Sequence, residues 1–317
     1  MSSVTVVPPA VKPAPRWKVS LAYATCFILW GSTWAAVKVG LEDLPPLRFV
    51  GTRMLVAGVA LLPFARSRGT ALGGGTGWRI AGLGVLQLAV PFGLLFVAQQ
   101  WIPSSWSALL FSTFPVWLLM VGRFVFPDQP LTGSKLFAAA LGLTGVVALQ
   151  YKELVSLSFS GQVLLGCAMT LFAASVVAVA NVLVRRHMTH VPPHLLTLVQ
   201  TLSSAVLLLS ASAMLEWNQP AHWTPKAVGA LLYLALGGTV LTYQCLYWLL
   251  PRISLAALGA MALLDTLVAV TLGVALLGEP LTPSLLAGGA LILTAAALAN
   301  RDEAPEAKVP PEAPPAG

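Results

Sequence analysis

The chain has 317 residues, of which 57% are hydrophobic and 9% are charged, and its mean hydropathy is +0.83. An ordinary soluble domain carries roughly 25% charged residues, so this composition excludes a water-soluble protein of the usual kind. The net charge of +7 does not indicate a nucleic-acid partner, because the 18 lysines and arginines are scattered between apolar runs. We expect the lipid bilayer to surround the chain.

Residues 1–18 form a basic, Pro-rich segment with no cleavage site after it, so we predict a cytoplasmic tail and not a removable signal peptide. Apolar stretches then follow, most of them about 20 residues long, which is enough to cross a bilayer. The ten predicted spans are 19–38, 47–64, 80–99, 104–123, 135–150, 161–184, 195–215, 227–249, 254–276 and 281–299. The polar, Pro-rich end of the chain, residues 300–317, is expected to be disordered.

Positive charges indicate how the spans are oriented. Lys and Arg in short loops mark the cytoplasmic side of a membrane. With the N-terminus inside, the outer loops hold only Lys152 and Lys226, with Lys38 and Arg48 at helix ends. An even number of spans returns the C-terminus to the cytoplasm, so both ends are predicted to lie inside.

An internal echo suggests that the chain arose by duplication. Residues 129–144 align with residues 279–294 at an offset of 150 positions, with nine identities in sixteen. Leu and Ala matches are common in so apolar a chain, but the shared Pro-Leu-Thr-x-Ser pattern is not explained by composition. We interpret the echo as a repeat of a larger unit.

The two predicted halves are residues 19–150 and 161–299, with five spans each. Since five is odd, the second half enters the membrane in the opposite orientation, which puts Pro130 inside and Pro280 outside. Inverted repeats of this kind let a central site open to one side and then to the other, as transporters require. The predicted fold is therefore an all-α membrane protein with ten transmembrane helices in two five-helix inverted repeats.

Two stretches of the sequence resemble a known family. The first span and its continuation read LWGSTWAAVKVGLEDLPPLRFVGTRMLVAG. The last span, together with the residues just before it, reads LLGEPLTPSLLAGGALILTAAALA. Both are similar to the opening and closing patterns of the EamA-type transporters of the drug/metabolite transporter superfamily. The residues that carry the opening pattern are Trp30, Gly31, Ser32, Lys38, Pro46 and Arg53.

The chain also departs from that family pattern. The first half has PDQPLT where Gly-Glu-x-Leu-Thr is usual, so Asp128 or Gln129 stands in for Glu279. The Glu-Pro pair expected in the ninth span corresponds to Asp265 and the threonine after it, whereas the first half has Pro115 without an acid. The resemblance implies an inner-membrane carrier that moves small metabolites, amino acids or drug-like compounds, often outward and without ATP.

Asp265 is the sharpest candidate site residue, because no other ionisable residue lies within ten positions of it in the ninth span. A carboxylate at the bilayer centre costs about 2.5 to 3.5 kcal/mol on insertion scales, so it faces a cavity or a partner. It could couple transport to protons or bind the amine of a substrate. Alternatively, it forms a fixed ion pair with Arg53, which could itself bind a substrate carboxylate or cap backbone carbonyls.

Polar and aromatic residues within the apolar spans form a second group of candidates, which includes Ser32 and Gln87. An amide in hydrocarbon needs a partner or water, so these side chains either line a cavity or join helices to one another. The predicted cavity residues besides Arg53 are Trp30, Thr33, Trp34, Gln99, Gln100, Asn181, Gln200, Tyr243, Gln244 and Tyr247.

No cofactor or metal is expected. The sequence has no GxxxxGK[ST] loop for ATP, no HExxH or GxSxG motif, and its three cysteines are far apart within apolar runs. The predicted function is a secondary transporter of a small-molecule substrate, working by alternating access. The alternatives are a structural or receptor-like membrane protein, which would have no use for inverted halves, and a membrane enzyme, for which one acid is too few. Whether the chain forms a homodimer is open, because no GxxxG face stands out.

Overall fold

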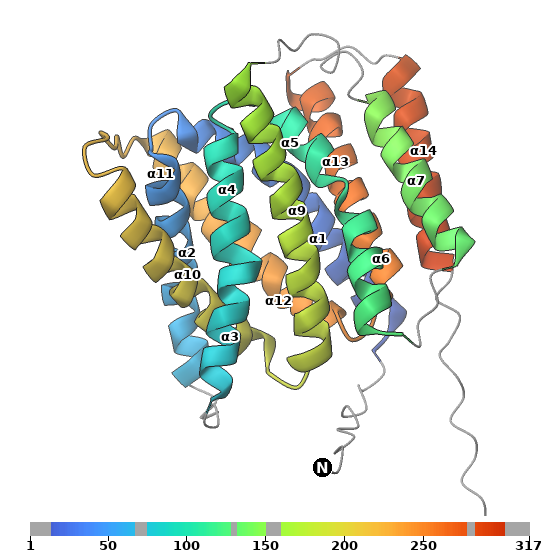
Figure 1. The fold of residues 1–317 in the computed structure, drawn as a ribbon, viewed down its shortest axis with the longest axis horizontal. Helices are drawn as coiled ribbons and strands as arrows, with labels where there is room; N and C mark the ends of the chain where they lie inside the picture. Colours follow the sequence, from blue (N-terminus) through green and yellow to red (C-terminus); the bar gives the residue numbers. More distant parts are fainter. Residues whose placement is uncertain (1–13, 67–74, 128–131, 150–159, 278–282, 302–317) are drawn as a thin grey trace, which may run out of the picture.

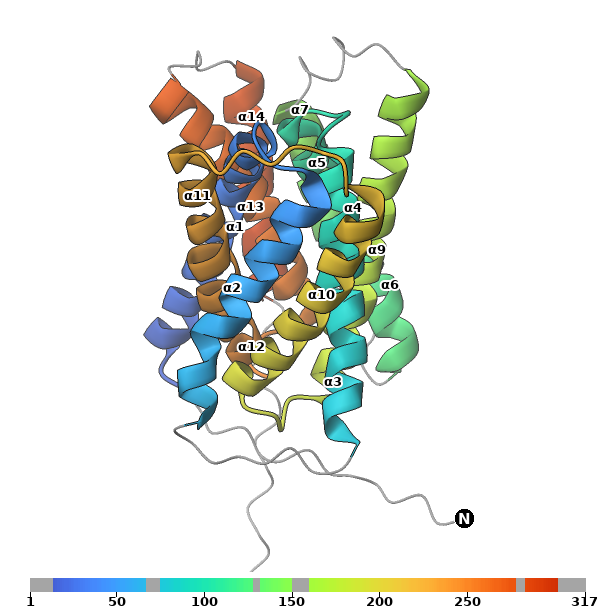
Figure 2. The same cartoon turned by 90° about the vertical axis from the view of Figure 1, so that its left-hand side faces the viewer.

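In the computed structural model, residues 14–66, 75–127, 132–149, 160–277 and 283–301 are described. All regular secondary structure in these ranges is helical, which confirms the all-α expectation. The helices lie side by side with their long axes along one direction (Figures 1 and 2). Most of the two predicted tails lies outside the described residues. The first few residues of each repeated stretch, 129–144 and 279–294, also lie outside them.

The helical elements follow the predicted spans closely. The N-terminal elements are α1 (Arg16–Leu41), α2 (Pro46–Arg66), α3 (Thr76–Gly84), η1 (Val85–Ala89), α4 (Val90–Ala98), α5 (Ser104–Phe111), α6 (Phe114–Val125) and α7 (Gly133–Leu149). The C-terminal elements are α9 (Gly161–His187), α10 (Pro193–Leu215), α11 (Pro225–Leu232), η2 (Tyr233–Leu241), α12 (Thr242–Leu249), α13 (Leu255–Leu277) and α14 (Pro283–Arg301).

By length and composition, seven helical stretches within the described ranges are long and apolar enough to cross a membrane. Three further apolar helices are shorter, Gly133–Ala148, Leu255–Ala269 and Leu286–Ala299. The first overlaps the fifth predicted span, and the other two lie within the ninth and tenth. The structure therefore supports a multi-pass membrane protein. Ten as the number of membrane crossings stays a prediction.

Three of the predicted spans are not regular α-helices throughout. The third contains the π-helical segment η1, which ends two residues before Pro91. Proline lacks the N–H that would bond the carbonyl of Gln87. The fourth is broken between α5 and α6, where Pro115 lies at the start of α6. The eighth contains the longer π-helix η2, in which the Thr239 hydroxyl donates to the carbonyl of Leu234 at 3.0 Å. These irregularities were not predicted.

The packing of the helices has a reciprocal pattern. Helix α2 packs against α10, and α7 packs against α14 at one edge of the bundle (Figure 1). Helix α1 contacts α13 and α12, whereas α9 contacts α6 and α4. If α1 corresponds to α9, α4 to α12 and α6 to α13, each of these contacts has a counterpart in the other half of the chain.

A buried carboxylate connects the end of α10 to the start of α2 at one end of the bundle. Glu216 follows α10 and accepts from the backbone N–H groups of Leu47 and Arg48 at 2.8 and 2.9 Å. These N–H groups belong to the first turn of α2 and have no partner within that helix. Because a negative charge at a helix N-terminus is favourable, Glu216 fixes the start of α2 against the end of α10.

Gly31 allows α1 to approach α13 closely. A Cβ atom at this position would lie 2.4 Å from the carbonyl oxygen of Asp265 and 2.7 Å from the Cβ of Val268. The nearest obstacle is a backbone atom, so a side chain here can be accommodated only if the two helices move apart. The contact holds Asp265 beside α1 in the middle of the bundle.

We therefore predict that Gly31→Ala destabilises the protein, because overpacking of this kind costs about 1 to 3 kcal/mol. The measurement is the apparent melting temperature of the purified protein in detergent. Gly82→Ala is the matched control, since a Cβ on Gly82 would meet nothing within 4 Å. Equal melting temperatures for the two variants would contradict this account of the α1–α13 contact.

Candidate functional site

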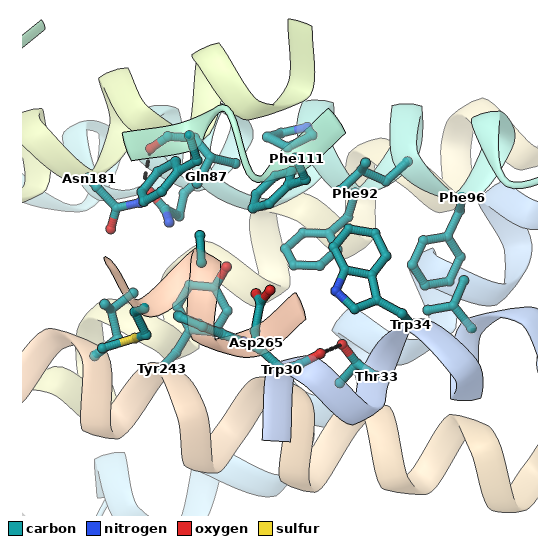
Figure 3. Close-up of a pocket in the computed structure, with 18 of the residues that line it drawn as sticks. Trp30, Thr33, Trp34, Gln87, Phe92, Phe96, Phe111, Asn181, Tyr243 and Asp265 are labelled. Carbon is teal, nitrogen blue, oxygen red and sulfur yellow. Dashed lines mark hydrogen bonds between the residues drawn. The ribbon is translucent and has the colours of Figure 1, made fainter. Parts of the chain in front are cut away.

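A cavity of about 90 Å³ lies in the middle of the bundle. A single water needs on the order of 10 to 15 Å³ on this measure, so the cavity has room for several water molecules. Figure 3 shows its labelled side chains pointing toward one another from α1, α4, α9, α12 and α13, among other elements. The cavity therefore lies where the N-terminal and C-terminal helices meet.

Asp265 reaches this cavity from α13, and its carboxylate lies near the centre of the view in Figure 3. The side chain is 4% exposed, and its Oδ1 accepts from the Thr266 hydroxyl at 3.3 Å. The Thr266 hydroxyl is in turn 2.8 Å from that of Ser112, at the break between α5 and α6. A carboxyl group in the interior of the bundle is thus joined to the N-terminal helices through two hydroxyl groups.

Arg53 also lines the cavity, from α2, and is 1% exposed. Its Nε donates to the Thr239 hydroxyl at 2.9 Å and its Nη2 to the carbonyl of Gly238 at 3.1 Å, both in η2. The guanidinium carbon lies 4.8 Å from the centre of the Phe92 ring and 5.9 Å from that of Phe96. Cation–π contacts and the two hydrogen bonds replace part of the hydration that the charge loses on burial.

Arg53 and Asp265 do not form the ion pair that the sequence allowed as an alternative. Within the described ranges, the ion pair with N and O atoms within 4.0 Å joins Lys226 to Glu42 on the surface. The cavity therefore presents one cationic and one acidic group that are held by different neighbours.

Several buried polar atoms of the cavity wall lack a partner among the residues that the structure describes. They are the Oε1 atoms of Gln87 and Gln99, the Oδ1 atom of Asn181 and the Nε1 atom of Trp34. An unsatisfied buried polar group costs about 1 to 3 kcal/mol. Water or a polar solute in the cavity would recover this free energy.

Aromatic rings form much of the remaining wall. Trp30 packs edge-on against Tyr243 with ring centres 5.9 Å apart, and Trp34 packs edge-on against Phe111 at 5.8 Å. Phe111 in turn stacks on Phe114 at 5.9 Å. These rings make this part of the cavity wall apolar and aromatic.

The structure brings together most of the predicted cavity residues. Those that line the cavity are Trp30, Thr33, Trp34, Arg53, Gln99, Asn181, Tyr243 and Asp265. The cavity wall also includes Phe92, Phe96, Phe111 and Phe114, which were not predicted. In an apolar span, the sequence does not distinguish a phenylalanine that faces a cavity from one that faces lipid.

Four of the predicted residues do not line the cavity. Gln100 is exposed at the end of α4. Gln244 donates to the Thr197 hydroxyl at 3.2 Å, and the Tyr247 hydroxyl donates to the side chain of Gln200. These two bonds join α12 to α10, so Gln200, Gln244 and Tyr247 connect helices in this structure, as the alternative interpretation had it.

The EamA-like transporter family matches the chain twice, over residues 16–151 and again over residues 164–301. The chain belongs to the EamA-like transporter family. The two matches cover most of the sequence. The first includes α1 to α7, and the second runs from the first turn of α9 to the end of α14. This membership confirms the resemblance seen in the opening and closing motifs, and it is consistent with the drug/metabolite transporter superfamily.

Several proteins named as transporters or efflux pumps are similar to this EamA-family chain. The uncharacterized transporter YoaV of Bacillus subtilis is 28% identical over 278 residues, which cover 87% of this chain and 94% of YoaV. The uncharacterized inner membrane transporter YedA of Escherichia coli K12 is 30% identical over 259 residues, which cover 81% of this chain and 82% of YedA. A probable amino-acid metabolite efflux pump of Salmonella typhimurium is 30% identical, with coverages of 84% and 89%.

A solved crystal structure has the same fold, with a TM-score of 0.76 and 20% sequence identity over 92% of this chain and all of the other. At this identity the likeness concerns the fold alone. The family and the names of its members point to a membrane transporter and not to an enzyme.

The hydrogen bond from Arg53 to Thr239 in η2 is expected to stabilise the protein. Thr239→Val removes the hydroxyl that accepts from Arg53 Nε, and leaving a buried charged donor without a partner costs about 1 to 3 kcal/mol. The apparent melting temperature should fall. Thr242→Val is the control, because the Thr242 hydroxyl makes only a 3.5 Å contact with the carbonyl of Thr239. An equal effect of both substitutions would show that Thr239 does not hold the guanidinium.

Proposed function

We propose that this EamA-family protein is a secondary transporter that exports small organic metabolites, such as amino acids or drug-like amphiphiles, by alternating access. The observation that carries the proposal is the central cavity, where Arg53 and Asp265 are both buried and are not paired with each other. Ionisable groups inside a membrane protein usually mark a substrate or ion pathway.

The cavity chemistry suits a solute with separated charges and an apolar body. Asp265 would receive a substrate amine and Arg53 a substrate carboxylate, while the rings of Trp34, Phe92 and Phe111 would pack against the apolar part. The name of the Salmonella typhimurium relative, a probable amino-acid metabolite efflux pump, agrees with such a substrate.

Alternating access requires two halves that can exchange shapes. The double family match and the reciprocal packing of α1 with α13 and of α9 with α6 support two repeats of five spans each. An odd number of spans per repeat makes the halves antiparallel in the membrane. We place the protein in the inner membrane, with both termini in the cytoplasm, following the distribution of Lys and Arg in the loops.

The direct test is counterflow in liposomes with purified, correctly inserted protein. Radiolabelled amino acids and aromatic amines are followed, and uptake above that of protein-free liposomes is expected for at least one of them. A lack of flux for every candidate would contradict the proposal. Growth of an overexpressing strain on toxic amino-acid analogues, compared with a strain that carries the empty vector, then narrows the substrate and shows the direction of transport.

We predict that Asp265→Asn reduces transport by at least about tenfold, because it removes a charged hydrogen-bond acceptor worth about 1.5 to 3 kcal/mol. Flux through liposomes is measured at several pH values. If Asp265 couples transport to protons, the residual flux of this variant no longer varies with pH. Asp265→Glu keeps the carboxyl group and is the control. Unchanged, pH-dependent transport by Asp265→Asn would instead make Asp265 a structural residue.

A second substitution tests the role of Arg53 in the same cavity. Arg53→Gln should weaken binding of an amino acid such as tryptophan by about 10- to 100-fold, because a charge-assisted hydrogen bond is lost. It should change the binding of tryptamine, which has no carboxylate, much less. Competition against labelled substrate measures both affinities. Equal losses for the two ligands would mean that Arg53 maintains the fold of the cavity and does not bind the carboxylate.

A further inference from the structure

Two cysteines far apart in the sequence meet where α1 packs against α12. Cys26 on α1 lies beside the turn of α12 that carries Cys245. Cys26 is fully buried and its Sγ donates to the carbonyl of Thr242 at 3.5 Å, whereas Cys245 is half-buried. Thr242 lies about one helical turn before Cys245, so both face α1 from the same side of α12. The third cysteine, Cys167, lies on α9.

The thiol pair lies directly behind the wall of the central cavity. Trp30 follows Cys26 by one turn of α1, and Tyr243 precedes Cys245 by two positions in α12. The rings of Trp30 and Tyr243 contact each other at 5.9 Å, and both line the cavity (Figure 3). The two helices also belong to different family matches, α1 to the first and α12 to the second.

Paired thiols on two helices have the chemistry of a soft-metal site. Thiolates are the ligands that thiophilic cations prefer, and metal binding displaces the thiol proton even where the free thiol is protonated. Mercuric ion takes two thiolates in a linear arrangement. Two S–H bonds break, two Hg–S bonds form and two protons leave, so the complex is neutral. A neutral complex suits an apolar interior, where a buried net charge is costly.

We propose that Cys26 and Cys245 form a two-thiolate site for thiophilic divalent cations, with mercuric ion as the probe, and that an ion bound there locks α1 to α12. The lock rests on the proposed function, because it matters only if the two helices move relative to each other during transport. The binding site itself does not depend on that function.

The test for binding uses the full-length protein in detergent, incubated with one equivalent of mercuric chloride and then washed with an excess of a monothiol. The unaltered protein should retain about one mercury per chain by intact-mass spectrometry. Cys26→Ser and Cys245→Ser should each retain at least about tenfold less, because one of the two metal–sulfur bonds is lost. Cys167→Ser is the matched control and should retain as much as the unaltered protein.

A second measurement needs no substitution and so does not depend on the folding of a variant. Maleimide labelling followed by peptide mapping should show that mercury protects the half-buried Cys245 and leaves Cys167, which is also half-buried, reactive. Retention that survives either Cys26→Ser or Cys245→Ser, or protection that falls on Cys167, would overturn the site.

Flux through liposomes then tests the lock. Mercury should inhibit transport by the unaltered protein, dithiothreitol should restore it, and Cys26→Ser should be insensitive. Undiminished flux in protein that retains mercury would overturn the lock and leave the transport function standing. A lack of flux before mercury is added would count against the proposed function and leave the binding measurements valid.

Discussion

The guanidinium of Arg53 is held inside an apolar bundle by groups from two other parts of the chain. Two of its N–H groups bond to η2, through the Thr239 hydroxyl and the carbonyl of Gly238, and the rings of Phe92 and Phe96 lie beside it. A cation at such a depth costs about 2.5 to 3.5 kcal/mol on insertion scales unless the protein replaces its hydration. The arrangement of α2, α4 and η2 around the cavity meets this requirement.

The π-helical segment explains how η2 can supply these partners. In a regular α-helix each carbonyl accepts from an N–H group four residues later, whereas a π-helix shifts this register and widens the turn. Here the Thr239 hydroxyl donates to the carbonyl of Leu234 and accepts from Arg53, so one side chain serves both the helix and the charge. The other π-helix, η1, contributes Gln87 to the same cavity. The two π-helical segments thus supply the Gly238 carbonyl and the side chains of Thr239 and Gln87 around the cavity.

Asp265 is held differently. It lies on α13, where Gly31 lets α1 approach to backbone contact, and its partner is the Thr266 hydroxyl, which meets Ser112 at the break between α5 and α6. Arg53 and Asp265 are therefore fixed by separate neighbours on the wall of one cavity. A solute that carries both charges could bind both groups at once, and its binding could favour one arrangement of the two halves over the other during a transport cycle.

The sequence by itself determined the class of the protein, the limits of the apolar helices and the family, since hydrophobic length, charge placement and the motifs around Trp30 and Glu279 are properties of the chain read in order. It also selected Arg53 and Asp265, because an ionisable residue in an apolar span stands out without any structure. Only the tertiary structure decided that Arg53 and Asp265 do not pair with each other. It also showed that Gln200, Gln244 and Tyr247 join α12 to α10 and do not line the cavity, and that phenylalanines form part of the cavity wall. The physical reason is that every face of a membrane helix is apolar, so periodicity does not tell a face toward lipid from a face toward a cavity. Contacts between helices make that distinction. They also bring Cys26 to the turn of α12 that carries Cys245, across most of the length of the chain.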